Sequence, residues 1–195
     1  KKIGLVGGLS WVSTLEYYKF LNKISNDHLG GAHSAHILLE SLSLHDFTTA
    51  MREDPEEKVC EKMMIDSVSI LREGGAEVFA LCANGLHRFV PAIERACDCK
   101  IIHIAEATAK EINKAAIKTV GLLGVKATME GSFYRDRLEA AGLEVVVPDA
   151  VALRDDFAAA AIALEDTSDQ RTLRYLTQFL GGLARTVEDI SDEPR

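Results

Sequence analysis

The feature that most constrains this sequence is a regular alternation of short apolar runs with longer amphipathic segments. Short apolar runs bounded by glycine predict buried strands, and the longer segments predict helices that pack on them. Strands that alternate with helices are typical of a parallel α/β sheet with right-handed crossovers. The predicted strands cover residues 3–6, 36–39, 77–81, 101–104, 120–124 and 143–148. The predicted helices cover residues 10–21, 55–72, 90–96, 107–116, 129–141, 158–164 and 171–180.

Two of these helices carry a more detailed prediction. Ser10 stands at a position where its side chain would cap the helix that runs through Leu15, Tyr18 and Leu21. The helix at residues 55–72 is expected to end at a pair of glycines. Its inward face is expected to consist of Val59, Met63, Ile65, and Val68 or Leu71.

The second half of the chain repeats the plan of the first. Residues 120–124 (V-G-L-L-G) echo residues 3–7 (I-G-L-V-G) in composition and in the positions of the glycines. We therefore expect two pseudo-symmetric lobes, each a mostly parallel sheet flanked by helices, covering residues 1–110 and 111–195. The pattern weakens after about residue 149, so the second lobe is expected to be incomplete and atypical there.

Composition excludes several classes of protein. A net charge of -8 and the lack of a Lys/Arg cluster argue against nucleic-acid binding. The apolar runs are shorter than the roughly 18–20 residues that cross a bilayer, and we expect no signal peptide because the first residues lack the charged-then-apolar pattern. Four free cysteines without a leader favour a cytoplasmic location. Cys97 and Cys99 form a C-x-C pair, but no second Cys or His pair completes a zinc pattern, so we expect no metal.

Cys82 is the strongest candidate for chemistry, in the segment Leu81-Cys82-Ala83-Asn84-Gly85. It stands where a predicted strand ends, and ligands bind at the carboxyl ends of parallel strands. A following helix would direct its free N–H groups at the loop and lower the thiol pKa, which favours the reactive thiolate. Asn84 adds an amide that can hold a carboxylate oxygen. The alternative is a small buried residue with a packing role.

Two turns could bind an anion or close a cleft. Residues 7–11 (G-G-L-S-W) allow close backbone approach before a helix start, although they do not match the dinucleotide pattern. Residues 124–128 form the matching turn of the second lobe and offer Lys126 or Thr128. For residues 7–11 a plain strand-to-helix turn is the favoured alternative, and for residues 124–128 the alternative is a turn with a solvated lysine.

Other polar residues stand near these turns. His87 follows Cys82 by five residues, and His103 lies at the end of the predicted strand at residues 101–104. A structural role is expected for each, with acid/base chemistry as the alternative. Met51 and Arg52 are expected in a loop after the second strand. Arg52 could hold a carboxylate through two hydrogen bonds, although a surface arginine is the simpler interpretation.

Several motifs together resemble one family. In order along the chain they are residues 7–14 (G-G-L-S-W-V-S-T) with Tyr17-Tyr18, residues 29–35 (L-G-G-A-H-S-A), residues 81–87 (L-C-A-N-G-L-H), residues 103–108 (H-I-A-E-A-T), and residues 120–124 with Thr128-Met129. This series resembles the cofactor-independent aspartate/glutamate racemases, which use two cysteines. The resemblance covers about three quarters of the chain and fades after Asp149.

The resemblance implies a function and a site. An acidic amino acid would lie between the lobes, and a thiol would move a proton at its α-carbon without pyridoxal phosphate or metal. Homodimerisation is also expected. Cys82 would be catalytic, and the substrate contacts would come from Gly8, Ser10, Met51, Arg52, Ala83, Asn84, Val125 and Thr128.

The sequence departs from the family at important positions. No cysteine follows Cys99, so the second catalytic cysteine of the family has no counterpart, and its G-C-T-E segment is absent. C-A-N-G replaces the family's C-T-N-T, and Val125 stands where threonine is usual. The resemblance still makes a racemase of aspartate or glutamate type the expected function, and the departures leave other functions open. The alternative is a one-base isomerase or decarboxylase, or a non-catalytic protein that binds a carboxylate.

Overall fold

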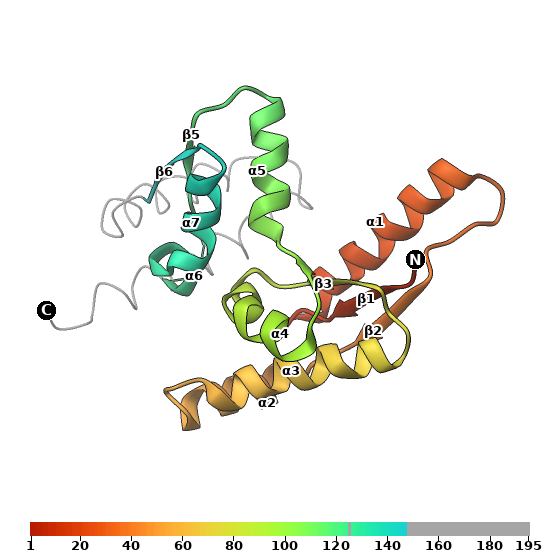
Figure 1. Ribbon diagram of the computed structural model, residues 1–195, viewed down its shortest axis with the longest axis horizontal. Helices are drawn as coiled ribbons and strands as arrows, with labels where there is room; N and C mark the ends of the chain where they lie inside the picture. Colours follow the sequence, from red (N-terminus) through yellow and green to blue (C-terminus); the bar gives the residue numbers. More distant parts are fainter. Residues whose placement is uncertain (125, 148–195) are drawn as a thin grey trace, which may run out of the picture. The chain divides into compact units, whose positions relative to one another are not determined.

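The computed structural model describes residues 1–124 and 126–147 (Figure 1). By its internal contacts the chain divides into two units, Lys1–Thr108 and Ala109–Arg195. Each unit contains parallel strands with helices, and the predicted α/β class is confirmed. The pseudo-symmetry of two lobes stays a prediction.

A four-stranded parallel sheet forms the centre of the first unit. Its strands are β1 (Ile3–Val6), β2 (Ile37–Glu40), β3 (Val78–Leu81) and β4 (Ile101–Ile102), in the order β2-β1-β3-β4. Val6 is in register with Glu40 on one side and with Leu81 on the other. The carboxyl ends of three strands therefore meet at one edge, which is where the candidate site was predicted.

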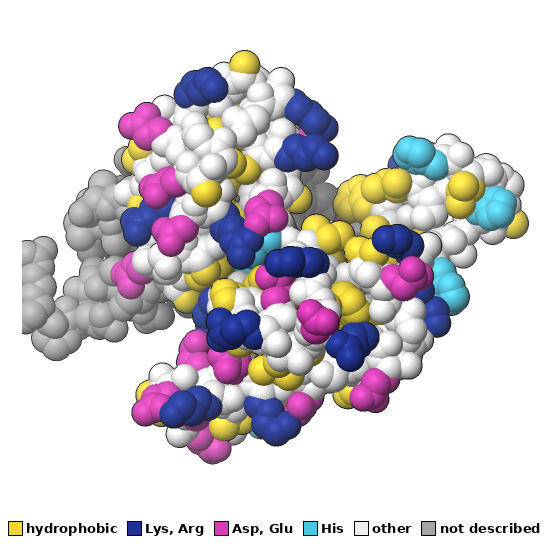
Figure 2. Space-filling model, in the orientation of Figure 1, with side chains coloured by type: hydrophobic (Ala, Val, Ile, Leu, Met, Phe, Trp, Pro, Cys, Tyr) yellow, Lys and Arg dark blue, Asp and Glu magenta, His cyan; other side chains and the backbone are white. Residues whose placement is uncertain are grey.

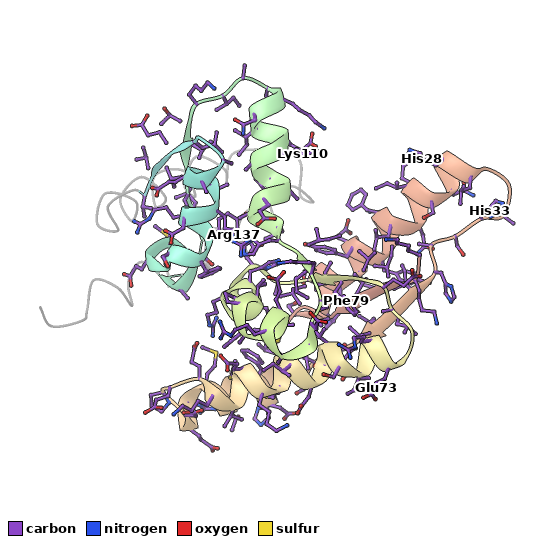
Figure 3. The ribbon with its side chains drawn as sticks, in the orientation of Figure 1. His28, His33, Glu73, Phe79, Lys110 and Arg137 are labelled. Carbon is purple, nitrogen blue, oxygen red and sulfur yellow. The ribbon has the colours of Figure 1, made fainter. Side chains whose placement is uncertain are left out.

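Five helical segments accompany this sheet, and all but the first contribute side chains to its core. They are α1 (Trp11–Leu29), α2 (Leu44–Glu53), α3 (Lys58–Glu73), the 3₁₀ helix η1 (Asn84–Phe89) and α4 (Val90–Cys97). α3 packs on β1 and β2, and both α2 and α4 pack on α3. Phe79 of β3 lies in the interior, 3% exposed (Figure 3). The apolar core also contains Val6, Phe47, Met64, Val68, Leu81, Leu86 and Ile93.

The predicted inward face of α3 is confirmed at Val68 and Leu71 and is wrong at Val59. Val59 is 50% exposed, while Met63 and Ile65 are only half-buried. The apolar pattern permits two neighbouring stripes on this helix, and packing against the sheet selects one of them. The buried stripe is Cys60, Met64, Ser67, Val68 and Leu71.

The helix after the first turn also differs in detail from its prediction. Ser10 occupies the N-cap position of α1, but its side chain makes no capping hydrogen bond. Leu15 and Tyr18 are each 53% exposed, and Thr14 is the buried residue of the helix. The most deeply buried side chain of α1 is thus a polar one. His28 and His33 lie at the far end of α1 and in the loop beyond it (Figure 3).

α2 replaces the loop expected around Met51 and Arg52. The Ser43 side chain accepts a hydrogen bond from the Asp46 amide and caps the helix. Phe47 and Ala50 are buried against α3, because a short amphipathic helix buries one face.

Figure 2 shows acidic and basic side chains interspersed over one face of the molecule.

The second unit is described as far as residue 147. α5 (Ile104–Lys114) runs across the division between the units and is followed by β5 (Thr119–Gly121) and β6 (Glu144–Val146), which pair in parallel. The helix predicted at residues 129–141 is two helices, α6 (Lys126–Glu130) and α7 (Ser132–Ala140), separated by Gly131. The helices expected at residues 158–164 and 171–180 lie outside the described residues. Within the described part of the chain, no helix is both long and apolar enough to span a membrane.

Candidate active site

Cys82 follows β3 directly and extends its pairing with β1. The Cys82 amide donates a hydrogen bond to the Val6 carbonyl oxygen over 2.9 Å. The residue is 2% exposed, yet the main apolar core contains Leu81 and Leu86 and not Cys82. The thiol is therefore buried at the edge of the sheet rather than inside its core.

The glycine turn after β1 lies against this cysteine. The Gly7 amide donates to the Glu40 carbonyl oxygen over 2.7 Å, which continues the pairing with β2. A Cβ added to Gly8 would lie 2.8 Å from the Cys82 carbonyl oxygen and 2.9 Å from that of Ser10. Only glycine allows the two chain segments to approach so closely.

Thr14 connects the glycine turn with the thiol. Its hydroxyl oxygen accepts a hydrogen bond from the Gly8 amide over 2.8 Å, and its side chain is hydrogen-bonded to Cys82. Thr14 is 5% exposed. Two segments that are distant in sequence, residues 8–14 and the end of β3, thus meet at one thiol. Thr14 was not among the predicted site residues, although it ends the 7–14 motif, and only the spacing within that motif could have indicated it.

The electrostatic environment of Cys82 contradicts the expected activation. Burial raises the pKa of the Cys82 thiol to about 12, and the hydrogen bond from Thr14 partly lowers it. The following segment is the short 3₁₀ helix η1 instead of an α-helix, so the expected lowering by a helix dipole does not decide the pKa. Desolvation outweighs the single hydrogen bond because a thiolate loses its hydration on burial. The resting thiol is protonated at neutral pH.

Two buried histidines support the segment after Cys82. His87 Nδ1 lies 3.1 Å from the Ala83 carbonyl oxygen and 3.2 Å from that of Asn84, so this nitrogen donates. His103 Nδ1 accepts from the Ala105 amide over 3.2 Å at the start of α5. The two rings meet edge to face with centroids 4.7 Å apart. These hydrogen bonds place a proton on Nδ1 of His87 and none on Nδ1 of His103.

An ion pair fixes the other end of η1. Arg88 Nε and Nη2 donate to the two carboxylate oxygens of Glu57 over 2.8 and 2.7 Å. Nη1 also donates to the Gly85 carbonyl oxygen over 2.9 Å, and Nη2 lies 3.7 Å from the Met51 sulfur. This arginine joins the Cys82 segment to the loop between α2 and α3.

The remaining predicted site residues are placed less centrally. Ser10, Met51, Arg52 and the Asn84 side chain are exposed, and Arg52 lies 3.4 Å from Thr49 Oγ1 in its own helix. Thr128 is buried in α6 of the second unit, 3.2 Å from a Cβ added to Gly124. Val125 and the side chain of Lys126 lie outside the described residues.

A separate open hollow of about 380 Å³ lies between α2 and α3. It is lined by His45, Asp46, Thr49, Ala50, Glu53, Asp54, Val59 and Met63, and Cys82 is not among them. Both carboxylate oxygens of Asp54, which lines the hollow, already accept hydrogen bonds from the Glu56 and Val59 amides. The hollow has no part in the chemistry argued from Cys82.

Among the described residues, no group of three or more Cys, His, Asp or Glu side chains could hold a metal ion.

The fold and site define a class of protein: a parallel α/β protein with a buried thiol at the carboxyl end of a central strand, beside a glycine turn. Residues 6–190 match the Asp/Glu/Hydantoin racemase family, and the chain belongs to that family. The resemblance seen in the motifs is thereby confirmed.

Individual relatives agree with this assignment. The chain is 29% identical over 154 residues to RacX of Bacillus subtilis, a broad specificity amino-acid racemase. That match covers 75% of this chain and 64% of RacX, so the chain spans less than two thirds of this relative. A crystal structure from Yersinia pestis, described as a candidate Asp/Glu racemase, is 34% identical with a TM-score of 0.74, covering 93% of this chain and 81% of the other. An aspartate racemase homologue from Pyrococcus horikoshii is 36% identical with a TM-score of 0.67, covering 76% and 65%.

Proposed function

We propose that this protein binds an acidic amino acid of aspartate or glutamate type and that the Cys82 thiol exchanges a proton with its α-carbon. The observation that carries the proposal is the position of Cys82 at the end of β3, held by Gly8 and Thr14. Membership in the Asp/Glu/Hydantoin racemase family supports the reaction class, and the similarity to the broad specificity amino-acid racemase RacX supports an amino acid as substrate.

The proton transfer balances without a cofactor. The Cys82 thiolate takes the α-proton, and the electron pair of the C–H bond delocalises into the substrate carboxyl group. Return of a proton from the resulting thiol to the carbon restores the amino acid and the thiolate. Because the α-proton is a very weak acid, donors around the carboxylate must stabilise the developing charge. We assign this binding role to Ser10, Ala83 and Asn84, with Met51 and Arg52 as further contacts. Gly8 shapes the turn beside them, because its amide already donates to Thr14.

The high pKa of the thiol sets the condition for this chemistry. A thiol with a pKa of about 12 is a strong base once ionised, but only a small fraction is ionised at neutral pH. Below that pKa, the rate of exchange is therefore expected to rise about tenfold per pH unit until another step limits it.

A one-base reaction is the second candidate, because no cysteine follows Cys99 in this sequence. Two-base racemisation needs acid/base groups on opposite faces of the α-carbon, whereas a single thiol serves one face. The one-base form would exchange the α-proton with retention of configuration. A carboxylate-binding protein without turnover is the further alternative.

The experiment incubates the protein with L- and D-aspartate and with L- and D-glutamate in deuterated water. Proton NMR follows loss of the α-proton, and chiral chromatography follows inversion. We expect exchange that disappears in Cys82→Ser and persists in the matched control Cys99→Ser. Inversion indicates two-base racemisation, and exchange with retention indicates the one-base form.

Absence of exchange with all four substrates, at pH values up to about 10, would refute the catalytic proposal. If a substrate still raises the melting temperature of the inactive protein, the carboxylate-binding alternative is supported instead. Persistence of exchange in Cys82→Ser would move the chemistry to another residue.

A further inference from the structure

Thr14 has an unusual position in α1. The helix carries many large apolar side chains, and Trp11, Leu15 and Tyr18 are 67%, 53% and 53% exposed. Amphipathic helices ordinarily bury such residues and expose their polar ones. Here the buried side chain of the helix is a threonine, which indicates that its hydroxyl group has a specific partner.

The hydrogen bonds of Thr14 have a defined direction. A threonine hydroxyl can donate one hydrogen bond and accept two. The Gly8 amide can only donate, so the Thr14 oxygen accepts this bond over 2.8 Å. The single hydroxyl proton is thus available for the Cys82 sulfur, to which the side chain is also hydrogen-bonded. A hydroxyl that accepts from an N–H is polarised and becomes a better donor.

Two structural consequences follow from this arrangement. Donation to the sulfur stabilises the thiolate more than the thiol, because hydrogen bonds to charged acceptors are the stronger ones. Acceptance from Gly8 holds the glycine turn at the Cys82 backbone, where a Cβ would lie only 2.8 Å from the carbonyl oxygen. One hydroxyl group therefore controls both the thiol and the turn beside it.

We propose that Thr14 is a positioning residue that directs the Cys82 sulfur, favours its ionisation and fixes the Gly8 turn. The proposal rests on the function assigned to Cys82 above, but it makes claims about the thiol that hold without turnover. Thr14 acts through Cys82 and Gly8 and need not touch the substrate.

The test compares Thr14→Val, which keeps the shape and removes the hydroxyl, with Thr14→Ser, which keeps the hydroxyl. The first readout is the rate at which iodoacetamide alkylates Cys82 at several pH values, followed by mass spectrometry of its peptide. Cys99 serves as an internal reference for reagent and pH. Because the thiolate is the reacting form, loss of a stabilising bond worth about one pKa unit slows alkylation about tenfold.

The sign of the change separates this role from simple packing. Thr14→Val is expected to slow Cys82 alkylation about tenfold, and Thr14→Ser is expected to remain within about threefold of the wild type. A merely structural threonine would leave the rate unchanged or, by loosening the site, increase it. An equal or faster rate in Thr14→Val would overturn the proposal.

A second readout tests the contact with the turn. Amide hydrogen exchange at Gly8 should accelerate in Thr14→Val and remain slow in Thr14→Ser, because only the serine hydroxyl can accept the amide proton. Thr14→Ala provides the same comparison if the valine variant does not fold. Unchanged Gly8 exchange in the variant that folds would contradict the positioning role.

These readouts separate failure of this inference from failure of the proposed function. If the wild type shows no α-proton exchange but Thr14→Val slows alkylation, Thr14 still positions the thiol and only the catalytic proposal fails. If exchange is observed, Thr14→Val is expected to lower kcat about tenfold with little change in KM. Normal kcat in Thr14→Val would count against the inference and leave the function of Cys82 intact.

Discussion

Gly8 lies so close to Cys82 that a Cβ on the glycine would be 2.8 Å from the cysteine carbonyl oxygen. The Cys82 carbonyl oxygen is a backbone atom, and a Cβ at residue 8 is bonded directly to the backbone. Relief of this close contact would therefore require the backbone to move. The contact joins the turn after β1 to the end of β3, and it makes the size of residue 8 a determinant of the candidate site.

Gly8→Ala is therefore expected to lower the free energy of unfolding by about 1–3 kcal/mol, the usual cost of overpacking. It should also displace the turn from Cys82 and abolish any exchange activity. Gly85→Ala is the matched control, since its Cβ would have Arg88 Nη1 at 3.4 Å as its nearest neighbour. Urea unfolding measures both variants. Equal stability of the two would show that the turn relaxes freely.

The protonated Cys82 thiol should make stability depend on alkaline pH. Its pKa of about 12 in the folded protein lies above the value near 9.0 that applies without burial. Between these values the folded state binds a proton that the unfolded state has lost, so stability is full below about pH 9 and falls as pH rises. The loss attributable to this group is at most about 1.4 kcal/mol per pH unit.

Urea unfolding at about pH 8 and about pH 10 checks this expectation. Cys82→Ser should lose less stability over this interval than the wild type. Burial also raises the pKa values of Cys60 and Cys99, but these residues remain in both proteins, so the difference reports Cys82. Identical pH profiles would mean that Cys82 ionises in the folded protein as an ordinary cysteine.

The ion pair between Arg88 and Glu57 should contribute measurably to stability. It is bidentate, and its side chains are only 18% and 34% exposed. Arg88→Lys keeps the charge but loses the two-pronged geometry, so we expect a cost of about 1–3 kcal/mol. A double-mutant cycle with Glu57→Gln isolates the pairwise energy.

The control pair is Lys62 and Asp66, whose side chains are 74% and 55% exposed. Lys62→Ala is expected to change stability by no more than about 0.5 kcal/mol, as for other exposed helix pairs. A coupling energy for Arg88 and Glu57 as small as that of the control pair would refute a structural role for the arginine.

The buried face of α3 can be tested at two adjacent methionines. Met64 is fully buried, whereas Met63 is half-buried on the neighbouring face. Met64→Ala is expected to cost about 2–5 kcal/mol, and Met63→Ala distinctly less, because a cavity forms only at the first position. Thermal or urea unfolding measures the difference. The reverse order would restore the face inferred from the sequence.

The sequence by itself determined three strands of the first unit and the place of Cys82, whereas the strand predicted at residues 101–104 ends at Ile102 and a helix begins at Ile104. Apolar runs bounded by glycine identified β1 and β3 to within a residue, because a buried strand needs a continuous apolar run and a turn residue at its end. The motif series identified the family. These properties are encoded in short stretches of neighbouring residues, which is why they could be predicted.

Only the tertiary structure decided what surrounds the thiol. Nothing local links Thr14 or Gly8 to Cys82, since the contact depends on the pairing of β1 with β3. The same holds for the inward face of α3, where Met64 was buried in place of Met63, and for α2, which replaced the expected loop at Met51 and Arg52. The pKa of Cys82 was predicted to fall and instead rises, because desolvation depends on how much water the folded chain removes from the sulfur.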